Sequence, residues 1–163
     1  MVASHQMTVR LEDDGAGALT FGGARYLLIR PETLAAMQKA VETALGREAA
    51  DCLAAGGLVG GSRATAVLSG TAEERVRRLV EIGGAIGWGR FTLERFAADG
   101  LVITVHRSPF AEAYGPSAAP VCHLTRGVLQ SLATQTLERP ARVVETACAA
   151  AGADRCRFEA TLA

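Results

Sequence analysis

Four side chains in the last third of the chain are of types that bind soft divalent metal ions. Cys122, Glu145, Cys148 and Cys156 fall within 35 residues of a sequence that is otherwise apolar and balanced in charge. Zinc prefers thiolate, imidazole and carboxylate ligands in a tetrahedron, and a site closed by four protein ligands is structural. Because no C-x-x-C pair is present, the residues alone leave three interpretations open: a metal site, buried apolar thiols, or a Cys148–Cys156 disulfide.

The two ends of the predicted closing hairpin would bring three of these side chains together. Residues 141–148 and 155–162 are expected to form its strands, which places Cys156 opposite Cys148. Glu145 lies three residues before Cys148, at the end of a strand, where a turn can direct both side chains to one point. The fourth cysteine of the chain lies far from this group, in the first helical region, where we expect a buried core thiol.

The remaining candidate ligand lies on a helix that we expect to begin at Pro120 and to be stopped by Pro140. Cys122 is near the N-terminus of this helix, so a metal bound by all four side chains would join the helix to the hairpin. Three thiolates and one carboxylate around a divalent ion leave a net charge of about −2. Arg155 and Arg157 are placed to offset that charge.

The rest of the chain alternates short hairpins with amphipathic helices. A Gly22-Gly23 pair between two short β-prone runs indicates an N-terminal hairpin of residues 18–21 and 26–29. A helix opens at Pro31, is interrupted near Gly46 and continues over residues 49–55. Apolar residues at three-to-four spacing give this helix one buried stripe of Leu34, Met37, Val41 and Leu45. The expected elements that follow are a glycine-rich helix–helix connection at 56–61, a helix over 72–86, strands over 90–96 and 101–106, and a loop over 108–120.

These elements predict an α+β fold with helices packed on an antiparallel sheet, because the strands come in hairpins separated by long helices. The length of 163 residues fits one domain, which we place at residues 16–163 after a flexible segment of residues 1–15. Seventeen basic and seventeen acidic residues cancel, so no field would attract nucleic acid or an anionic membrane. No run of 18 apolar residues and no signal segment is present, which favours a cytoplasmic protein with reduced thiols.

The sequence resembles the 4-vinyl reductase domain over residues 25–162. The most specific part is the set Cys122, Glu145-x-x-Cys148 and Cys156. The resemblance extends over the following segments: Val143-Val-Glu-Thr-Ala-Cys148, Cys156-Arg-Phe158, Gly87-Trp88-Gly89, Ser108-Pro109-Phe110 and Pro120-Val-Cys122 with Gly127. Members of this family include sensor domains of phenol-responsive transcription activators, proteins linked to bacteriochlorophyll synthesis, and small archaeal hydrocarbon-binding proteins. Their fold is similar to that of subunits of the TRAPP vesicle-tethering complex.

The resemblance implies a structural zinc ion, a dimer and an apolar pocket. In the phenol sensors the matching three cysteines and glutamate hold zinc, so the resemblance assigns that role to Cys122, Glu145, Cys148 and Cys156. In the same sensors a His and a Trp orient the phenol hydroxyl. This sequence departs from that pattern, since His106 stands near the position expected for the sensor's Trp.

Aromatic and histidine side chains around the central strands are the candidates for lining such a pocket, since ligand pockets are mostly apolar with a few polar groups. They are Trp88, Phe91, His106, Phe110 and Tyr114. Each has a plainer interpretation as a packing or surface residue.

We favour a zinc-containing domain that binds a small apolar or aromatic molecule and signals through a homodimer to a separate protein. A tetrapyrrole 4-vinyl reductase or carrier and a dimeric structural adaptor are the alternatives. A dinucleotide fingerprint and a readable nucleophile–base pair are both missing, which argues against an autonomous enzyme.

Overall fold

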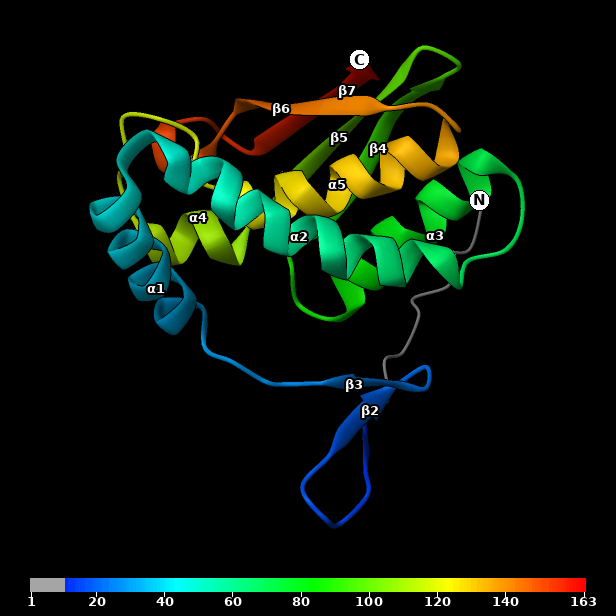
Figure 1. Ribbon diagram of the computed structural model, residues 1–163, viewed down its shortest axis with the longest axis horizontal. Coiled ribbons are helices and arrows are strands. Elements are labelled where there is room, and N and C mark those ends of the chain that lie inside the picture. The colour runs from blue at the N-terminus through cyan, green and yellow to red at the C-terminus, as the bar shows by residue number, and fades with distance from the viewer. Residues whose placement is uncertain (1–10) are drawn as a thin grey trace.

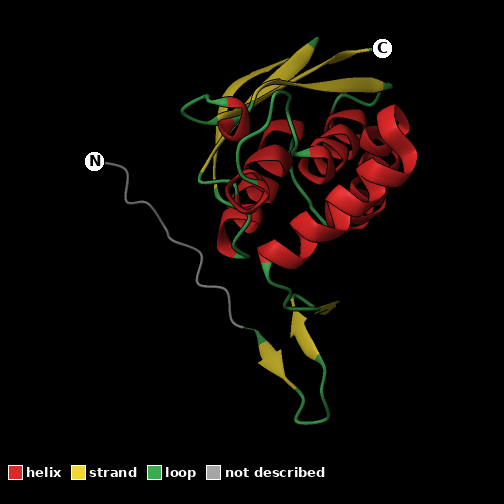
Figure 2. Cartoon of the chain, turned by 90° about the vertical axis from the view of Figure 1, so that its left-hand side faces the viewer, coloured by secondary structure: helices red, strands yellow, loops and turns green. Residues whose placement is uncertain are grey.

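A four-stranded antiparallel sheet forms one layer of the protein, in a computed structural model that describes residues 11–163. Its strands are β4 (Arg90–Ala97), β5 (Gly100–His106), β7 (Cys156–Leu162) and β6 (Ala141–Ala147), in that spatial order. The long helices all lie on one side of this sheet (Figures 1 and 2). The prediction of an α+β fold with helices on an antiparallel sheet is therefore confirmed.

Five α-helices and two short 3₁₀ turns make up the helical layer in the described residues. They are α1 (Pro31–Leu45), η1 (Gly46–Glu48), α2 (Ala49–Ala66), α3 (Ala72–Ala85), α4 (Pro109–Tyr114), α5 (His123–Thr136) and η2 (Ala149–Ala151). Local sequence explains several of the starts. Pro31 begins α1, where a missing N–H costs no hydrogen bond, and Thr71 and Glu74 form a capping box at the start of α3.

The glycine-rich segment 56–61 is helical, so its prediction as a helix–helix connection is wrong. It forms the middle of α2, which packs against α5. A β-carbon at Gly57 would lie 2.1 Å from the carbonyl oxygen of Leu124, and one at Gly61 would lie 2.7 Å from that of Val128. Gly127 of α5 faces α2 in the same way, with its hypothetical β-carbon 2.0 Å from the carbonyl oxygen of Ala54. These glycines allow a close approach of two backbones and do not break the helix.

The segment 108–120, predicted as a loop, contains the short helix α4. Ser108 caps it, because the Ser108 hydroxyl accepts a hydrogen bond from the Ala111 N–H at 3.5 Å, and Pro109 occupies the first turn. The following long helix begins at His123 and not at Pro120, and Cys122 stands at its N-cap position.

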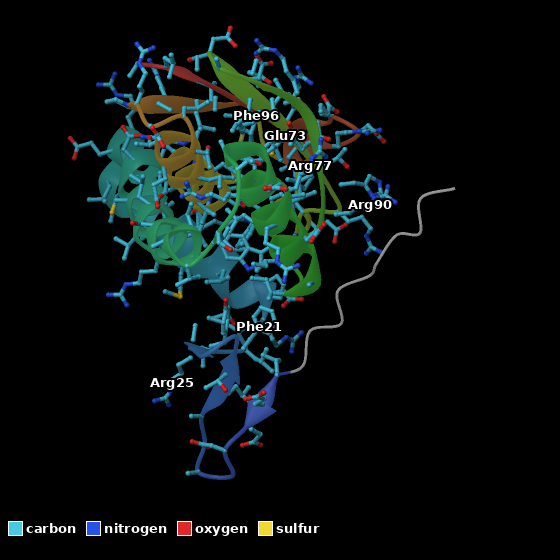
Figure 3. The ribbon with its side chains drawn as sticks, turned by 90° about the vertical axis from the view of Figure 1, so that its right-hand side faces the viewer. Phe21, Arg25, Glu73, Arg77, Arg90 and Phe96 are labelled. Atoms are coloured by element: carbon cyan, nitrogen blue, oxygen red, sulfur yellow. The ribbon has the colours of Figure 1, made fainter. Side chains whose placement is uncertain are left out.

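The N-terminal hairpin projects from the body of the protein (Figure 1). Its strands β2 (Leu19–Phe21) and β3 (Ala24–Tyr26) are joined by the Gly22-Gly23 turn, and the short strand β1 (Glu12–Asp13) pairs with β2 to make a three-stranded antiparallel sheet. Figure 3 places Phe21 and Arg25 on this projecting part. The expected second strand ends at Tyr26 instead of residue 29, and the three apolar residues after it are exposed. Of the segment 1–15 expected to be flexible, residues 1–10 lie outside the described residues.

The core lies between the sheet and α3 and α5, and α1 contributes little to it. Its largest fully buried side chains include Phe158, Leu129 and Leu132. The predicted buried stripe of α1 is wrong at Met37 and Leu45, which are exposed. α1 instead buries Ala35 and Gln38, whose amide donates to the carbonyl oxygen of Val121. None of the helices in residues 11–163 combines the length and apolar character needed to cross a bilayer.

Candidate metal centre and adjoining cavity

A β-bulge brings Glu145 and Cys148 to the same point. Side chains alternate between the two faces of a strand, so residues three apart would ordinarily point in opposite directions. In the pairing of β6 with β7, Glu145 is opposite Phe158 and Ala147 is opposite Arg157, so one extra residue is inserted between them. This bulge reverses the alternation and turns Cys148 to the buried face that Glu145 already occupies.

Cys156 and Cys122 complete the group from the neighbouring elements. Cys156 begins β7 and points to the buried face shared by Phe158 and Ala160, as the alternating burial of this strand shows. Cys122 immediately precedes α5 and is buried. The sulfur and carboxylate oxygen atoms of Cys122, Glu145, Cys148 and Cys156 all lie within 4.8 Å of one another. These three cysteines and one glutamate could hold a metal ion, as the sequence predicted.

The distances between the sulfur atoms match the edges of a small tetrahedron. The Sγ atoms of Cys122 and Cys156 are 3.6 Å apart, and those of Cys156 and Cys148 are 4.0 Å apart. Four ligands at about 2.3 Å from a central ion would place neighbouring sulfur atoms at about 3.8 Å. The cysteines are free thiols, so the disulfide interpretation does not describe this structure.

The carboxyl group of Glu145 is held on one side and unpartnered on the other. Its Oε2 accepts a hydrogen bond from the backbone N–H of Cys122 at 2.9 Å. Its Oε1 is buried without a hydrogen-bond partner among the described residues. Burial raises the pKa of the Glu145 carboxyl to about 8. A buried oxygen without a partner costs free energy, and a bound cation would supply the missing interaction.

Hydrogen bonds within the cluster concentrate negative charge on Cys148. Donation from the Cys122 and Cys156 thiols lowers the pKa of the Cys148 thiol far below its ordinary value. The pKa of the Cys122 thiol is raised, mainly by its hydrogen bond with Cys148 and then by its hydrogen bond with Cys156 and by burial. The hydrogen bond with Cys122 lowers the pKa of the Cys156 thiol. Donation from Cys156 to Cys148, together with burial, outweighs this effect and raises the pKa of Cys156 to about 12. Without a metal, negative charge in the cluster is therefore favoured on Cys148 over Cys122 and Cys156.

Local dipoles surround the cluster in place of the two arginines that the sequence suggested. Arg155 pairs with Asp154, and Arg157 pairs with Glu94 and Glu159. The groups that contact the sulfur atoms are the hydroxyl of Ser108, 3.5 Å from Cys122 Sγ, and the N–H of Ala149, 3.4 Å from Cys156 Sγ. Such contacts fix ligand side chains in place and stabilise negative charge on sulfur.

An apolar cavity of about 180 Å³ lies beside α5, on the side of the domain formed by α2, α3 and β4. None of its lining side chains among residues 11–163 is charged. The lining residues are Tyr26, Gly60, Ala64, Leu79, Val80, Ile82, Gly83, Ile86, Trp88, Phe91, Thr125, Val128 and Leu129. Three of them can form hydrogen bonds through their side chains, namely Tyr26, Trp88 and Thr125. The Oγ1 of Thr125 is buried and has no partner in the described part of the chain.

Two of the five candidate pocket residues line this cavity, and a third supports it. Trp88 and Phe91 are in its wall. Phe110 packs edge-on against Trp88, with ring centroids 4.9 Å apart, and lines a second, adjoining groove. His106 and Tyr114 are not among the lining residues. Tyr114 instead donates to Glu42 at 2.6 Å.

Sequence reasoning missed the lining residues contributed by the helices and by the N-terminal hairpin. Thr125 carried a usable signal, because it is a polar residue on the otherwise apolar side of a helix. Gly60 carried none, since its neighbourhood was interpreted as a flexible connection. Cys52 was expected in the core and is exposed, so the prediction for this thiol is wrong.

One helix joins the metal centre to the cavity. Cys122 stands at the N-cap of α5, and Thr125, Val128 and Leu129 on the next turns of the same helix line the cavity. An ion bound at Cys122 would therefore fix the start of the helix that forms one wall of the cavity.

The sequence of the C-terminal part has a counterpart among known protein families. Residues 101–162 match the family model of the 4-vinyl reductase domain. Over residues 101–162, the match confirms the resemblance drawn from the cysteine and glutamate pattern, and it includes all four candidate metal ligands. The matched region begins at β5 and contains the rest of the sheet apart from β4, together with α4 and α5. No curated protein sequence matches the chain.

Three solved structures have folds similar to that of the whole chain. The phenol-responsive sensory domain of the transcription activator PoxR, solved with phenol, gives a TM-score of 0.81 at 20% identity, covering 94% of this chain and 84% of that domain. A vinyl-4-reductase family protein from Methanocaldococcus jannaschii gives 0.59 at 15% identity, covering 86% and 85%. Subunit 3 of the trafficking protein particle complex from Naegleria fowleri, covalently bound to palmitic acid, gives 0.60 at 11% identity, covering 82% and 95%. These likenesses establish a shared fold that extends beyond the region matched by the family model.

Proposed function

We propose that this protein is a sensor domain that binds a small, uncharged, mostly apolar molecule in the cavity beside α5. The observation that carries the proposal is the cavity itself. Native cores are close-packed, with few voids larger than a water molecule. The wall side chains of this apolar cavity of about 180 Å³ lack packing partners on one side, and a bound molecule would supply those contacts.

The size and walls of the cavity define the class of ligand. Apolar cavities of about 150 Å³ stay dry and bind benzene or xenon, so this cavity suits a molecule with one ring or of similar size. An ionised ligand would lose its hydration without gaining a charged partner, because no described lining side chain is charged. Thr125, Tyr26 and Trp88 allow a ligand to carry one hydrogen-bonding group.

We further propose that Cys122, Glu145, Cys148 and Cys156 hold a structural zinc ion. Three thiolates and one carboxylate are ligands that zinc prefers, and four protein ligands leave no open position for catalysis. The short sulfur–sulfur distances and the unpartnered Glu145 oxygen support this choice. The ion would attach the β6–β7 hairpin to the start of α5 and so stabilise the wall of the cavity.

The output of the domain is proposed to be a signal to another protein through a homodimer. The fold is shared with a phenol-responsive sensory domain of a transcription activator, which supports a sensing role. Leu27 and Leu28, between the projecting hairpin and α1, are 81% and 68% exposed. Exposed apolar residues of this kind are typical of contact surfaces, and this segment is the place where we propose that the dimer forms.

The size of the cavity favours this function over the two alternatives. A tetrapyrrole is larger than the drug-sized ligands that occupy pockets of about 300–1,000 Å³, so a reductase or carrier for it would need a wider groove. A purely structural adaptor would be expected to have a filled core.

The single tryptophan of the chain makes the proposal directly testable. Trp88 is the only tryptophan and lines the cavity, so its fluorescence reports on occupancy. We expect toluene and 4-methylphenol to change this fluorescence saturably, while benzoate, which is similar in size but charged, leaves it unchanged. Equal responses to benzoate, or no saturable response to any of the neutral probes, would contradict the proposal.

A further inference from the structure

Helix α2 contains two pairs of adjacent glycines, and only one member of each pair is explained by packing. Gly57 and Gly61 face α5, where a β-carbon would collide with backbone atoms. Gly56 would place a β-carbon 3.8 Å from a methyl group of Leu124, an ordinary contact, and a β-carbon at Gly60 would meet no atom within 4 Å. A glycine inside a helix lowers helix stability relative to alanine, so Gly60 is a destabilising choice that the helix packing does not require.

Gly60 differs from Gly56 in lining the cavity. It lies one helical turn before Ala64, which also lines the cavity, so a side chain at position 60 would extend along the same wall. Gly60 is also exposed to solvent, which means that the cavity reaches the surface beside it. The other glycine in the wall, Gly83, is explained by packing, since its hypothetical β-carbon would lie 3.1 Å from the ring of Phe91.

We propose that Gly60 determines the size of ligand that the cavity admits. The inference rests on the proposed function in one respect, namely that the cavity is a ligand site. Gly60 lines the cavity, and the space where its side chain would lie is open. A larger residue at position 60 would fill that space without colliding with the protein, so it would exclude ligand while leaving the fold intact.

Paired substitutions at Gly60 and Gly56 separate this effect from general changes in the helix. Gly60→Leu and Gly56→Leu place the same side chain one turn apart on the exposed part of α2. Xenon and toluene serve as probes in the full chain, xenon detected by NMR shift changes and toluene by Trp88 fluorescence. Xenon enters apolar voids whatever the natural ligand is, so it tests the role of Gly60 independently of the proposed function.

We expect Gly60→Leu to weaken the binding of both probes at least tenfold and Gly56→Leu to change it less than twofold. The milder Gly60→Ala and Gly56→Ala should both raise the melting temperature by about 1–4 °C, because alanine is the better helix former. Gly60→Ala should also weaken toluene binding, which shows that the loss does not come from unfolding.

Three results would overturn the inference, and one further result concerns the proposed function alone. Unchanged xenon binding in Gly60→Leu, or an equal loss in Gly56→Leu, would show that Gly60 does not set the limit. If the wild type binds xenon but not toluene, the proposed ligand class is wrong, and the xenon results still decide the role of Gly60. If the wild type binds neither probe, the cavity is not a binding site and both proposals fail.

Discussion

Replacing Cys148 with serine should remove the metal and a large part of the stability of the domain. The four candidate ligand residues are between 0% and 7% exposed, so the loss of the ion leaves buried polar groups that water cannot reach. Each unsatisfied buried polar group costs about 1–3 kcal/mol, and structural zinc in small domains contributes at most about 10–16 kcal/mol. We therefore expect Cys148→Ser to lower the free energy of unfolding by at least about 3 kcal/mol. For a domain of this length that corresponds to a drop in melting temperature of about 6–12 °C.

The assay is thermal unfolding followed by circular dichroism, with metal content measured by mass spectrometry on the same samples. Cys52→Ser is the matched control, because Cys52 is an exposed thiol outside the cluster. It should leave melting and metal content at the wild-type level. A strong chelator should bring the wild type down to the melting temperature of Cys148→Ser and should not affect the variant. Full metal content with wild-type melting in Cys148→Ser would show that Cys148 is not a ligand of a structural metal.

Further predictions concern the metal, the cavity and the contact between α2 and α5. Metal binding at pH 6–7 should release about three protons, two from the thiols of raised pKa, Cys122 and Cys156, and one from Glu145, whose pKa is about 8. The affinity for the metal should therefore rise with pH, and it should rise less steeply above pH 8, where Glu145 is already ionised. Calorimetry in buffers of different ionisation enthalpy measures this number, and release of fewer than two protons would contradict it. Thr125→Val should stabilise the protein or leave its melting unchanged, because it removes an unpartnered buried hydroxyl, and should shift preference from 4-methylphenol toward toluene. An unchanged ratio of the two affinities would exclude a role for the hydroxyl. Gly57→Ala should destabilise the domain by about 1–3 kcal/mol in denaturant unfolding, in contrast to Gly56→Ala, because its methyl group collides with the backbone of α5.

The sequence was sufficient to predict the two hairpins of the sheet, because local signals mark their strands, but it did not predict the pairing of β5 with β7 that joins them. A two-residue turn of Ala98 and Asp99 separates β4 from β5, which begins at Gly100, and Pro140 separates α5 from β6. It was not sufficient to predict the backbone conformation of glycine-rich segments. The residues of segment 56–61 have the composition of a flexible connection, and only the approach of α5 shows that a β-carbon would not fit there. Composition cannot distinguish a glycine that breaks a helix from one that allows two helices to touch.

The metal site was predictable in its residues but not in its geometry. The types and order of Cys122, Glu145, Cys148 and Cys156 pointed to a metal, yet spacing alone left buried thiols and a disulfide open. A three-residue separation in a strand directs side chains to opposite faces, and the bulge after Glu145 that corrects this has no clear sequence signal.

The cavity was harder to predict than the metal site. Aromatic residues near the central strands were reasonable candidates, and Trp88 and Phe91 do line it. His106 and Tyr114 do not. A void is formed by what neighbouring helices fail to fill, so its walls depend on how α2, α3 and α5 are placed relative to one another. Gly60 and Thr125 become recognisable as wall residues only once those helices are in position.

A crystal structure of the full chain soaked with 4-methylphenol, with data collected at the zinc absorption edge, would test the metal site and the ligand cavity in one experiment. We expect one anomalous peak per chain, enclosed by the three cysteine sulfur atoms and the Glu145 carboxylate. We also expect ligand density in the cavity, with the ligand hydroxyl near Thr125, Trp88 or Tyr26. An ordered Cys–Glu cluster without a peak, in a protein whose cavity is closed by side chains, would contradict both the metal site and the proposed ligand site.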